Sequence, residues 1–148
     1  MRALWTTGLM AVICLFAIPA SAGTIYEIDY AGYDVTLTDS KKVKTELTDF
    51  AFWTGPNILV AQRGDAKVEI PFRKIRTLSV GKYLPVKGHS PATVVTTRGK
   101  TYKLQITRFE GRRYLSGKSD FGTLRIQLMQ CANLHFKRLS HTDPRDRD

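Results

Sequence analysis

The chain has 148 residues, with 23 lysines and arginines against 13 aspartates and glutamates, so its formal net charge is +10 at neutral pH. This length suits one domain. The basic balance favours acidic partners, such as anionic lipid headgroups, acidic polysaccharide, nucleic acid or an acidic protein, and carries no information about the fold.

The first 22 residues have the pattern of a secretory signal peptide. Arg2 supplies a positive charge, residues 4–19 are almost entirely apolar, and Ala20-Ser21-Ala22 has the small residues of a cleavage site. The alternative is an N-terminal membrane anchor, but the apolar stretch is shorter than the ~20 residues that a membrane span needs. We therefore expect an exported protein, periplasmic or secreted, whose mature form begins at Gly23 and is not transmembrane.

Cysteine usage argues against a disulfide framework. Cys131 is the only cysteine that remains after processing, so no disulfide is expected within the domain. A reactive thiol or an intermolecular bridge is the alternative. Cys131 takes the position of Ile75 in a repeated apolar pattern described below, and buried cysteine behaves as a small hydrophobic side chain. We therefore expect it in the core.

Residues 23–80 form the first predicted half. Apolar and polar residues alternate in stretches 26–30, 33–37 and 43–47, which is the period expected of half-buried strands, and the apolar residues 58–61 form another short strand. Turn residues 38–41 join two of these strands into a hairpin. Phe50 and Phe52 share one strand face and are expected in the core. Trp53 faces the other way beside a Gly-Pro turn and is a candidate for partner contact.

A short apolar pattern ends each half. In residues 68–78, apolar side chains occupy every second position from 68 to 72 and then every third position, 75 and 78. The same pattern recurs in residues 124–134, with Leu134 in the place of Leu78. The change of step near Phe72 predicts one turn of tight helix that carries Ile75 inward. Pro71 cannot donate a hydrogen bond to a neighbouring strand, so it marks a sheet edge or a strand end.

Residues 81–91 contain two glycines and two prolines and are expected to link the halves. The second half, residues 92–138, contains a hairpin across Arg98-Gly99-Lys100 that echoes the first hairpin, with Gly99 matched to Ser40 and Lys100 to Lys41. Residues 139–148 are polar and are expected to be disordered. No run of ten or more residues has helical spacing. We therefore predict an all-β domain, residues 23–138, built from two similar halves of short antiparallel strands.

The apolar positions of the two halves resemble the strand order of Sm-like small β-barrels. They are Val35, Leu37, Val43, Leu47, Val68, Ile70, Ile75 and Leu78 in the first half and Val95, Leu104, Ile126 and Leu134 in the second. The resemblance covers most of the mature chain and implies tandem small barrels or one fused sandwich. Sm-like RNA-binding proteins place an Arg-Gly pair near the last two strands, where this chain has Arg76-Thr77 and Ala132-Asn133. RNA binding therefore does not carry over, and no specific nucleic-acid site is expected.

The first group of candidate anion or partner contacts lies in the first apolar pattern. It consists of Arg73, Lys74 and Arg76, whereas the second copy has uncharged residues at the same positions. The fold therefore does not need basic residues there. The alternative is a solvated face that protects an edge strand.

The second group is Arg108, Arg112 and Arg113, in a turn that also contains Phe109 and Tyr114. Aromatic and guanidinium planes stack on sugars or bases, and the charges hold phosphate or carboxylate. In the alternative interpretation, the two rings pack inward and the three arginines point into water.

Catalytic and metal-binding motifs are absent from the sequence. No histidine has a second histidine or cysteine at metal-ligand spacing, and no serine has the context of a nucleophile elbow. We therefore expect no cofactor and no catalytic residue.

The leading hypothesis is an exported, non-enzymatic β module that binds or scaffolds at the cell envelope. Its basic surface would contact an anionic polymer or an acidic protein. The first alternative is a structural or assembly accessory subunit that pairs exposed strand edges, as a homo-oligomer or in an envelope complex. The second is a hydrolase that acts on envelope polymers.

Overall fold

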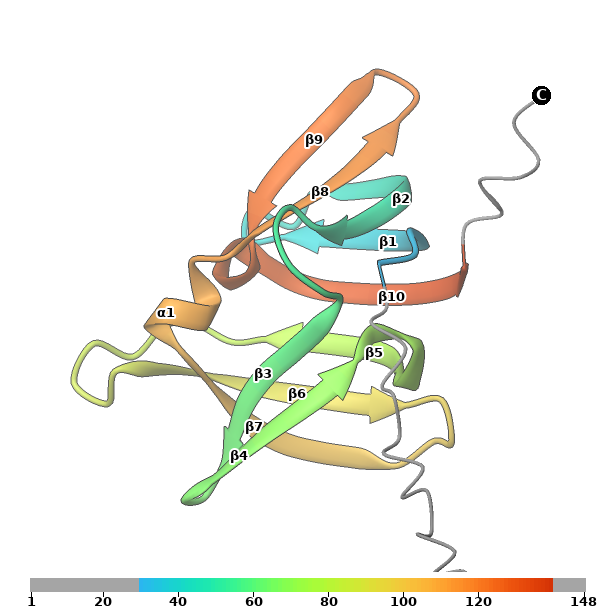
Figure 1. Ribbon diagram of the computed structural model, residues 1–148. Coiled ribbons are helices and arrows are strands. Elements are labelled where there is room, and N and C mark those ends of the chain that lie inside the picture. Colours follow the sequence, from blue (N-terminus) through green and yellow to red (C-terminus); the bar gives the residue numbers. More distant parts are fainter. Residues whose placement is uncertain (1–29, 140–148) are drawn as a thin grey trace, which may run out of the picture.

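The computed structural model describes residues 30–139 (Figure 1), so the predicted signal peptide and residues 140–148 of the predicted tail lie outside the described residues. Strands make up most of this part of the chain. The elements are β1 (Tyr33–Asp39), β2 (Lys44–Phe52), β3 (Ile58–Arg63), β4 (Ala66–Pro71), η1 (Phe72–Lys74), β5 (Ile75–Val80), β6 (His89–Thr96), β7 (Thr101–Thr107), α1 (Arg108–Gly111), β8 (Tyr114–Ser119), β9 (Gly122–Gln127), η2 (Leu128–Gln130) and β10 (Cys131–Leu139). The all-β prediction is confirmed. Strand β6 begins at His89, inside the predicted linker, and the predicted turn at 108–113 contains the short helix α1.

The strands form one antiparallel ladder of ten, in the order β4-β3-β7-β6-β5-β10-β1-β2-β8-β9. This ladder bends into two five-stranded units that lie one above the other in Figure 1. The upper unit contains β10, β1, β2, β8 and β9, and the lower unit contains β5, β6, β7, β3 and β4. Both units therefore have the same internal strand order.

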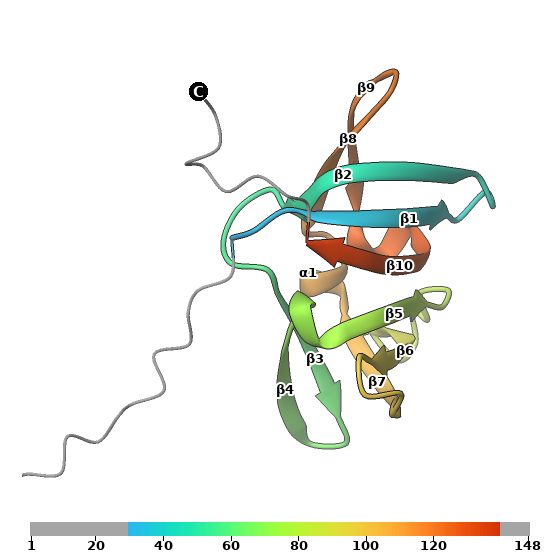
Figure 2. The same cartoon turned by 90° about the vertical axis from the view of Figure 1, so that its right-hand side faces the viewer.

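Each unit combines strands from both halves of the sequence. The first hairpin, β1–β2, pairs with β10 and β8 of the second half, and the second hairpin, β6–β7, pairs with β5 and β3 of the first half. The chain crosses between the units twice, at residues 53–57 and at α1, which lies between the units in Figures 1 and 2. Each unit therefore consists of the hairpin of one half of the sequence and the other strands of the other half, so the two halves have exchanged hairpins.

An approximate two-fold axis relates the units. Strands β5 and β10 join them, and Leu78 pairs with Leu134 at the centre of this contact. Leu134 is the copy of Leu78 in the repeated apolar pattern of the sequence. A segment that pairs with its own copy in antiparallel register has the geometry of an isologous interface.

The two hairpins correspond in a register that differs from the predicted one. Lys42 and Gly99 occupy the same turn position, with φ of 65° and 80°, so the predicted match of Ser40 with Gly99 is wrong. The amide of Lys42 donates to the Asp39 carbonyl, and the amide of Gly99 donates to the Thr96 carbonyl. Strand alternation alone does not distinguish the two matches, because a shift by two positions keeps the apolar side chains on the same face.

One aromatic cluster connects the cores of the two units. Rings of both units take part, with centroid distances of 5.0 to 6.4 Å, from Tyr33, Phe50, Phe52, Phe72 and Phe136. Phe72 is fully buried because η1 turns it inward. The predicted helical turn at this point is confirmed, as are the predicted core positions of Phe50, Phe52 and Cys131.

Candidate functional site

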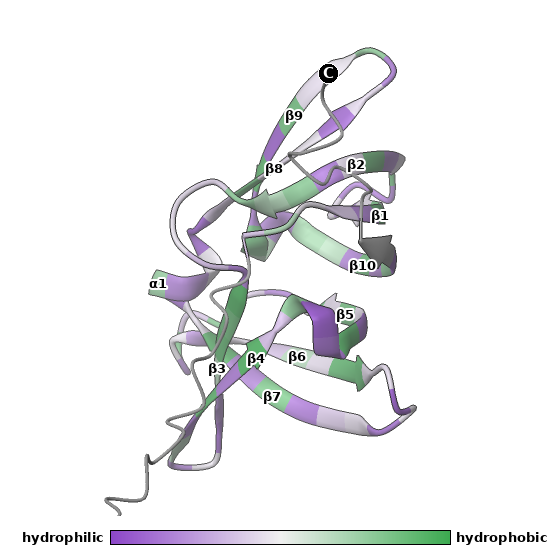
Figure 3. Ribbon diagram, turned by 45° about the vertical axis from the view of Figure 1, so that its right-hand side comes forward, coloured by the Kyte–Doolittle hydropathy of each residue, from purple (hydrophilic) through white to green (hydrophobic). Residues whose placement is uncertain are grey.

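Arg73, Lys74 and Arg76 lie against the turn between β6 and β7. Arg73 and Lys74 are exposed in η1, which is the strongly hydrophilic segment beside β5 in Figure 3. The amide of Thr97 donates to the Lys74 carbonyl at 3.0 Å, and the Arg76 guanidinium donates to the Thr97 carbonyl at 2.9 Å. These two hydrogen bonds fix the turn against η1.

The turn adds two cations that the sequence analysis missed as site residues, Arg98 and Lys100. They line a hollow of about 380 Å³ together with Lys74, Thr96, Thr97 and Tyr102. We refer to Arg73, Lys74, Arg76, Arg98 and Lys100 as the basic cluster. The charged turn was visible in the sequence, but nothing there placed it beside η1, which belongs to the other half.

No carboxylate neutralises the basic cluster within the described residues. The described ion pairs include Lys67–Glu69, Arg113–Glu110, Lys118–Asp49 and Lys137–Glu46. None of them includes a member of the basic cluster. Its positive potential therefore reaches into solvent over about 8 Å, the screening length at physiological ionic strength.

At the five corresponding positions the upper unit has one cation, and Lys42 and Lys44 lie in or next to the same turn. The two-fold relation matches the basic cluster with Met129, Gln130, Ala132, Lys41 and Val43. Asp39 also lies in this turn, where its carboxylate accepts hydrogen bonds from the amides of Lys41 at 2.8 Å and Val43 at 2.9 Å. Because the two units share strand order and turn geometry, the fold does not require the cations of the basic cluster.

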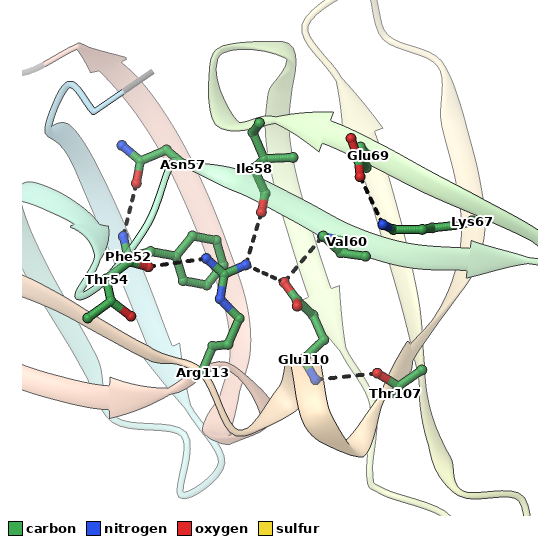
Figure 4. A network of polar contacts seen from close by, with 10 residues as sticks. All are labelled: Phe52, Thr54, Asn57, Ile58, Val60, Lys67, Glu69, Thr107, Glu110 and Arg113. Carbon is green, nitrogen blue, oxygen red and sulfur yellow. Dashed lines mark hydrogen bonds and ion pairs between the residues drawn. The ribbon is translucent and has the colours of Figure 1, made fainter. Parts of the chain in front are cut away.

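Arg113 of the second predicted group is held by protein groups at the crossover between the units. Its guanidinium donates to Glu110 Oε1 at 2.7 Å, to the Ile58 carbonyl at 3.2 Å and to the Thr54 carbonyl at 3.4 Å (Figure 4). Its Cζ atom lies 3.6 Å from the centre of the Phe52 ring. These contacts leave Arg113 little freedom to bind a ligand, and we assign it a structural role.

Glu110 completes this crossover network. Its Oε1 atom also accepts a hydrogen bond from the amide of Val60 in β3, at 3.2 Å, and its own amide donates to Thr107 Oγ1 at 3.3 Å, which caps α1. Val60 pairs with Glu69 of β4, and on the opposite side of β3 the carboxylate takes the place of a strand partner, because β3 pairs with β7 only at Gln62. The network therefore joins α1 to β3 and to residues 53–57. The chain changes unit at α1 and at residues 53–57, so the network connects the two crossings.

The other predicted residues do not gather at the basic cluster. Arg108 and Arg112 are exposed at α1, and Arg108 Cζ lies 5.9 Å from the centre of the Tyr83 ring. Trp53 is 54% exposed, and Arg125 Cζ lies 3.7 Å from the centre of its ring, a contact that the sequence did not indicate. Phe109 is 84% exposed, so the interpretation in which the rings of this segment pack inward is wrong.

A separate hollow of about 470 Å³ brings several carboxylates together. Its lining consists of Asp34, Glu46, Leu47, Thr48, Lys118, Ser119, Asp120 and Lys137. Hydrogen bonds from Lys137 and Thr36 lower the pKa of Glu46, so this carboxylate is ionised at neutral pH. Hydrolysis of a glycosidic bond by a carboxylate pair requires one carboxyl that stays protonated, and Glu46 does not meet this requirement.

Metal and thiol chemistry also find no support in residues 30–139. No group of three or more histidine, cysteine, aspartate or glutamate side chains in this region is arranged to hold a metal ion. Burial, followed by the nearby charge of Asp39, raises the pKa of Cys131 to about 12. Its thiol is therefore unreactive at neutral pH. Helices of membrane-spanning length and hydrophobicity are absent from the described region.

The chain matches no protein-family model, and no curated protein matches it.

Proposed function

We propose that this chain is an exported, non-enzymatic β module that binds an anionic polymer or an acidic protein surface through the basic cluster. The observation that carries the proposal is the asymmetry between the two units. Five cations that have no carboxylate partner among residues 30–139 meet at one end of the lower unit, and only one cation occupies the five equivalent positions of the upper unit. Export is inferred from the residue pattern of positions 1–22.

The binding mechanism is electrostatic. Single exposed ion pairs contribute only about 0–1 kcal/mol, so useful affinity requires several contacts with one ligand that carries several negative charges. Lys74, Arg98 and Lys100 face one hollow and can contact such a ligand together. Because these contacts are exposed, we expect binding to weaken strongly as salt is added.

A charge-matched pair of variants tests the proposal. Lys74→Gln/Arg98→Gln/Lys100→Gln removes three charges from the hollow, and glutamine keeps part of each aliphatic chain. Lys41→Gln/Lys42→Gln/Lys44→Gln removes the same charge from the corresponding turn of the upper unit, where all three lysines are exposed. Arg76 is left unchanged because it holds Thr97.

The assay is elution of residues 23–148 from heparin resin in a salt gradient, followed by the same experiment on envelope-fraction resin. We expect the wild-type protein and the upper-unit variant to elute late and the hollow variant to elute clearly earlier. Equal elution of the two variants would show that only net charge matters, and would refute a specific site.

The ends of the sheet support the assembly alternative. Within the part of the chain that the structure describes, strands β4 and β9 each have a strand neighbour on one side only, and such edges can pair with another chain. Strand β4, however, carries the exposed Lys67–Glu69 pair, and edge charges oppose such pairing. A molar mass by light scattering that rises with concentration, equally in wild type and in the hollow variant, would favour assembly over anion binding.

A further inference from the structure

A second hollow lies beside the first and shares Thr97 with it. This smaller hollow has a volume of about 150 Å³, and its lining consists of Tyr33, Phe72, Arg73, Ile75, Thr97, Phe136 and Lys137. Arg73 and Lys74 are neighbours in η1, and Arg73 lines the smaller hollow whereas Lys74 lines the larger one. The two hollows therefore flank η1 and each contains at least one cation of the basic cluster.

The two hollows differ in the charge they offer. The larger one presents three cations without carboxylate partners in the described chain, whereas in the smaller one Lys137 pairs with Glu46 and leaves Arg73 as the unneutralised cation. A small anion would satisfy one hollow only. A flexible chain with acidic groups on successive units would contact both, and the second contact would add affinity because it forms within the bound complex.

The larger hollow is also rich in hydroxyl groups. Thr96, Thr97 and Tyr102 line it beside the cations. Thr96 Oγ1 accepts a hydrogen bond from the Lys100 amide at 3.2 Å, which leaves its own O–H group to donate. Hydroxyl and cationic groups side by side suit a ligand that carries both hydroxyls and acidic groups.

Exposed apolar side chains are missing from this surface. The large apolar residues exposed within residues 30–139 are Tyr30, Val43, Trp53, Val86, Phe109, Tyr114 and Phe121. None lies in η1 or in the β6–β7 turn. Single-stranded nucleic acid is held largely by stacking of its bases on exposed aromatic rings, and amphipathic segments that lie on a membrane surface bury apolar side chains in the lipid. Tyr102 lines the larger hollow, but it is only partly exposed and Arg63 Cζ lies 5.4 Å from the centre of its ring. The basic cluster therefore offers no freely exposed ring and no exposed apolar side chain.

We infer that the ligand of the basic cluster is an acidic polysaccharide, a linear hydroxyl-rich polyanion that passes over η1 and occupies both hollows. This inference rests on the proposed function and specifies its ligand class. Lys74, Arg98 and Lys100 bind one acidic unit of the polymer, and Arg73 binds a later unit along the same chain.

The test is calorimetric binding of size-defined heparin oligosaccharides, from disaccharide to dodecasaccharide, to residues 23–148 at physiological salt. We expect affinity to rise at least about tenfold with length and then to level off, once a fragment reaches both hollows. Arg73→Gln should remove most of this gain and leave disaccharide binding unchanged. Lys44→Gln, in the upper unit, is the matched single-charge control and should keep the gain.

Three competitor ligands of matched charge separate the possible failures: single-stranded DNA, polyglutamate and vesicles with anionic phospholipid. Should any of them bind as tightly as the long oligosaccharide and still depend on Lys74, Arg98 and Lys100, the proposed function stands and the polysaccharide assignment is wrong. A length gain that survives Arg73→Gln overturns the two-hollow path. If the Lys74→Gln/Arg98→Gln/Lys100→Gln variant binds every ligand as tightly as the wild-type protein does, the proposed function itself is wrong.

Discussion

Glu110→Ala tests whether the network at the crossover holds the two units together. In the native protein, the Glu110 side chain is 6% exposed and pairs with Arg113, whose side chain is 22% exposed. The substitution removes the acceptor of the Val60 amide and the counter-ion of Arg113 in one step (Figure 4). The hydrogen bond to Val60 joins α1 to β3, where the chain passes from one unit to the other, so its removal should loosen this crossover.

The expected cost follows from burial. Removing one partner of a buried ion pair typically destabilises a protein by about 3–5 kcal/mol, because the other charge is left uncompensated. Arg113 keeps some access to water and its bonds to the Ile58 and Thr54 carbonyls. We therefore expect a loss near the lower end, about 3 kcal/mol, which is a large part of the roughly 5–15 kcal/mol typical of a whole domain.

The matched control is Glu69→Ala in β4, which breaks the Lys67–Glu69 pair on the protein surface. Both side chains of this pair are more than half exposed, at 66% and 56%. Exposed pairs contribute about 0–1 kcal/mol. Glu69→Ala should therefore lower the free energy of unfolding only slightly, although both ion pairs lie close to β3 in Figure 4.

Urea unfolding measures both effects. Trp53, the only tryptophan of residues 23–148, lies in the crossover and reports on it by fluorescence, while circular dichroism follows the strands. A double-mutant cycle of Glu110→Ala with Arg113→Ala should give a coupling energy of at least about 1 kcal/mol. If Glu110→Ala costs no more than Glu69→Ala, or if the coupling is near zero, the network does not stabilise the crossover and the reasoning fails.

Three further outcomes are expected. Gly117→Ala should destabilise the upper unit by about 1–3 kcal/mol in urea unfolding, because a Cβ atom there would lie 3.0 Å from Leu47 Cβ; unchanged stability would mean that β2 and β8 can separate. Burial raises the pKa of Cys131 from 9.0 to about 12, so the folded state keeps a proton that the unfolded state loses between these values, and stability should fall as pH rises through this window. Cys131→Val should remove that share of the loss, and an identical pH profile in the variant would contradict the assignment. Lys137→Ala should raise the pKa of Glu46 towards its ordinary value in an NMR titration, because the Lys137 hydrogen bond is the main cause of its lowering. The stability that this contact adds is present above the ordinary pKa of glutamate and is lost as pH falls. An unchanged pKa of Glu46 in the variant would show that the contact does not form.

Local sequence patterns were sufficient to predict the strands and the core. Alternation of apolar residues marks half-buried strands wherever they occur along the chain, so Phe50, Phe52 and Cys131 could be placed inside before any tertiary contact was known. The spacing of apolar residues changes from two to three near Phe72, and this change indicated the helical turn η1. A 3₁₀ helix has three residues per turn, so it too can be read from local spacing. The cations at 73–76 stood out by comparison with the second copy.

The exchange of hairpins could not be predicted from these patterns. Apolar alternation does not tell whether a unit closes with its own hairpin or with that of the other half, because both hairpins present the same alternation to the neighbouring strands. The choice depends on how the chain crosses at residues 53–57 and at α1, and there on contacts between distant residues such as Glu110 and Val60. The sequence showed Glu110 only as an acidic residue in a charged turn.

The composition of the basic cluster depends on the same exchange. The sequence by itself determined an all-β chain with two similar halves and a group of basic residues at the end of the first half. Had each half kept its own hairpin, η1 would face the turn that contains Asp39 and Lys41, and Arg98 and Lys100 would lie beside the uncharged η2. Only the tertiary structure brings Arg98 and Lys100 to Lys74, because strand pairing across the two halves decides which turn meets which helix.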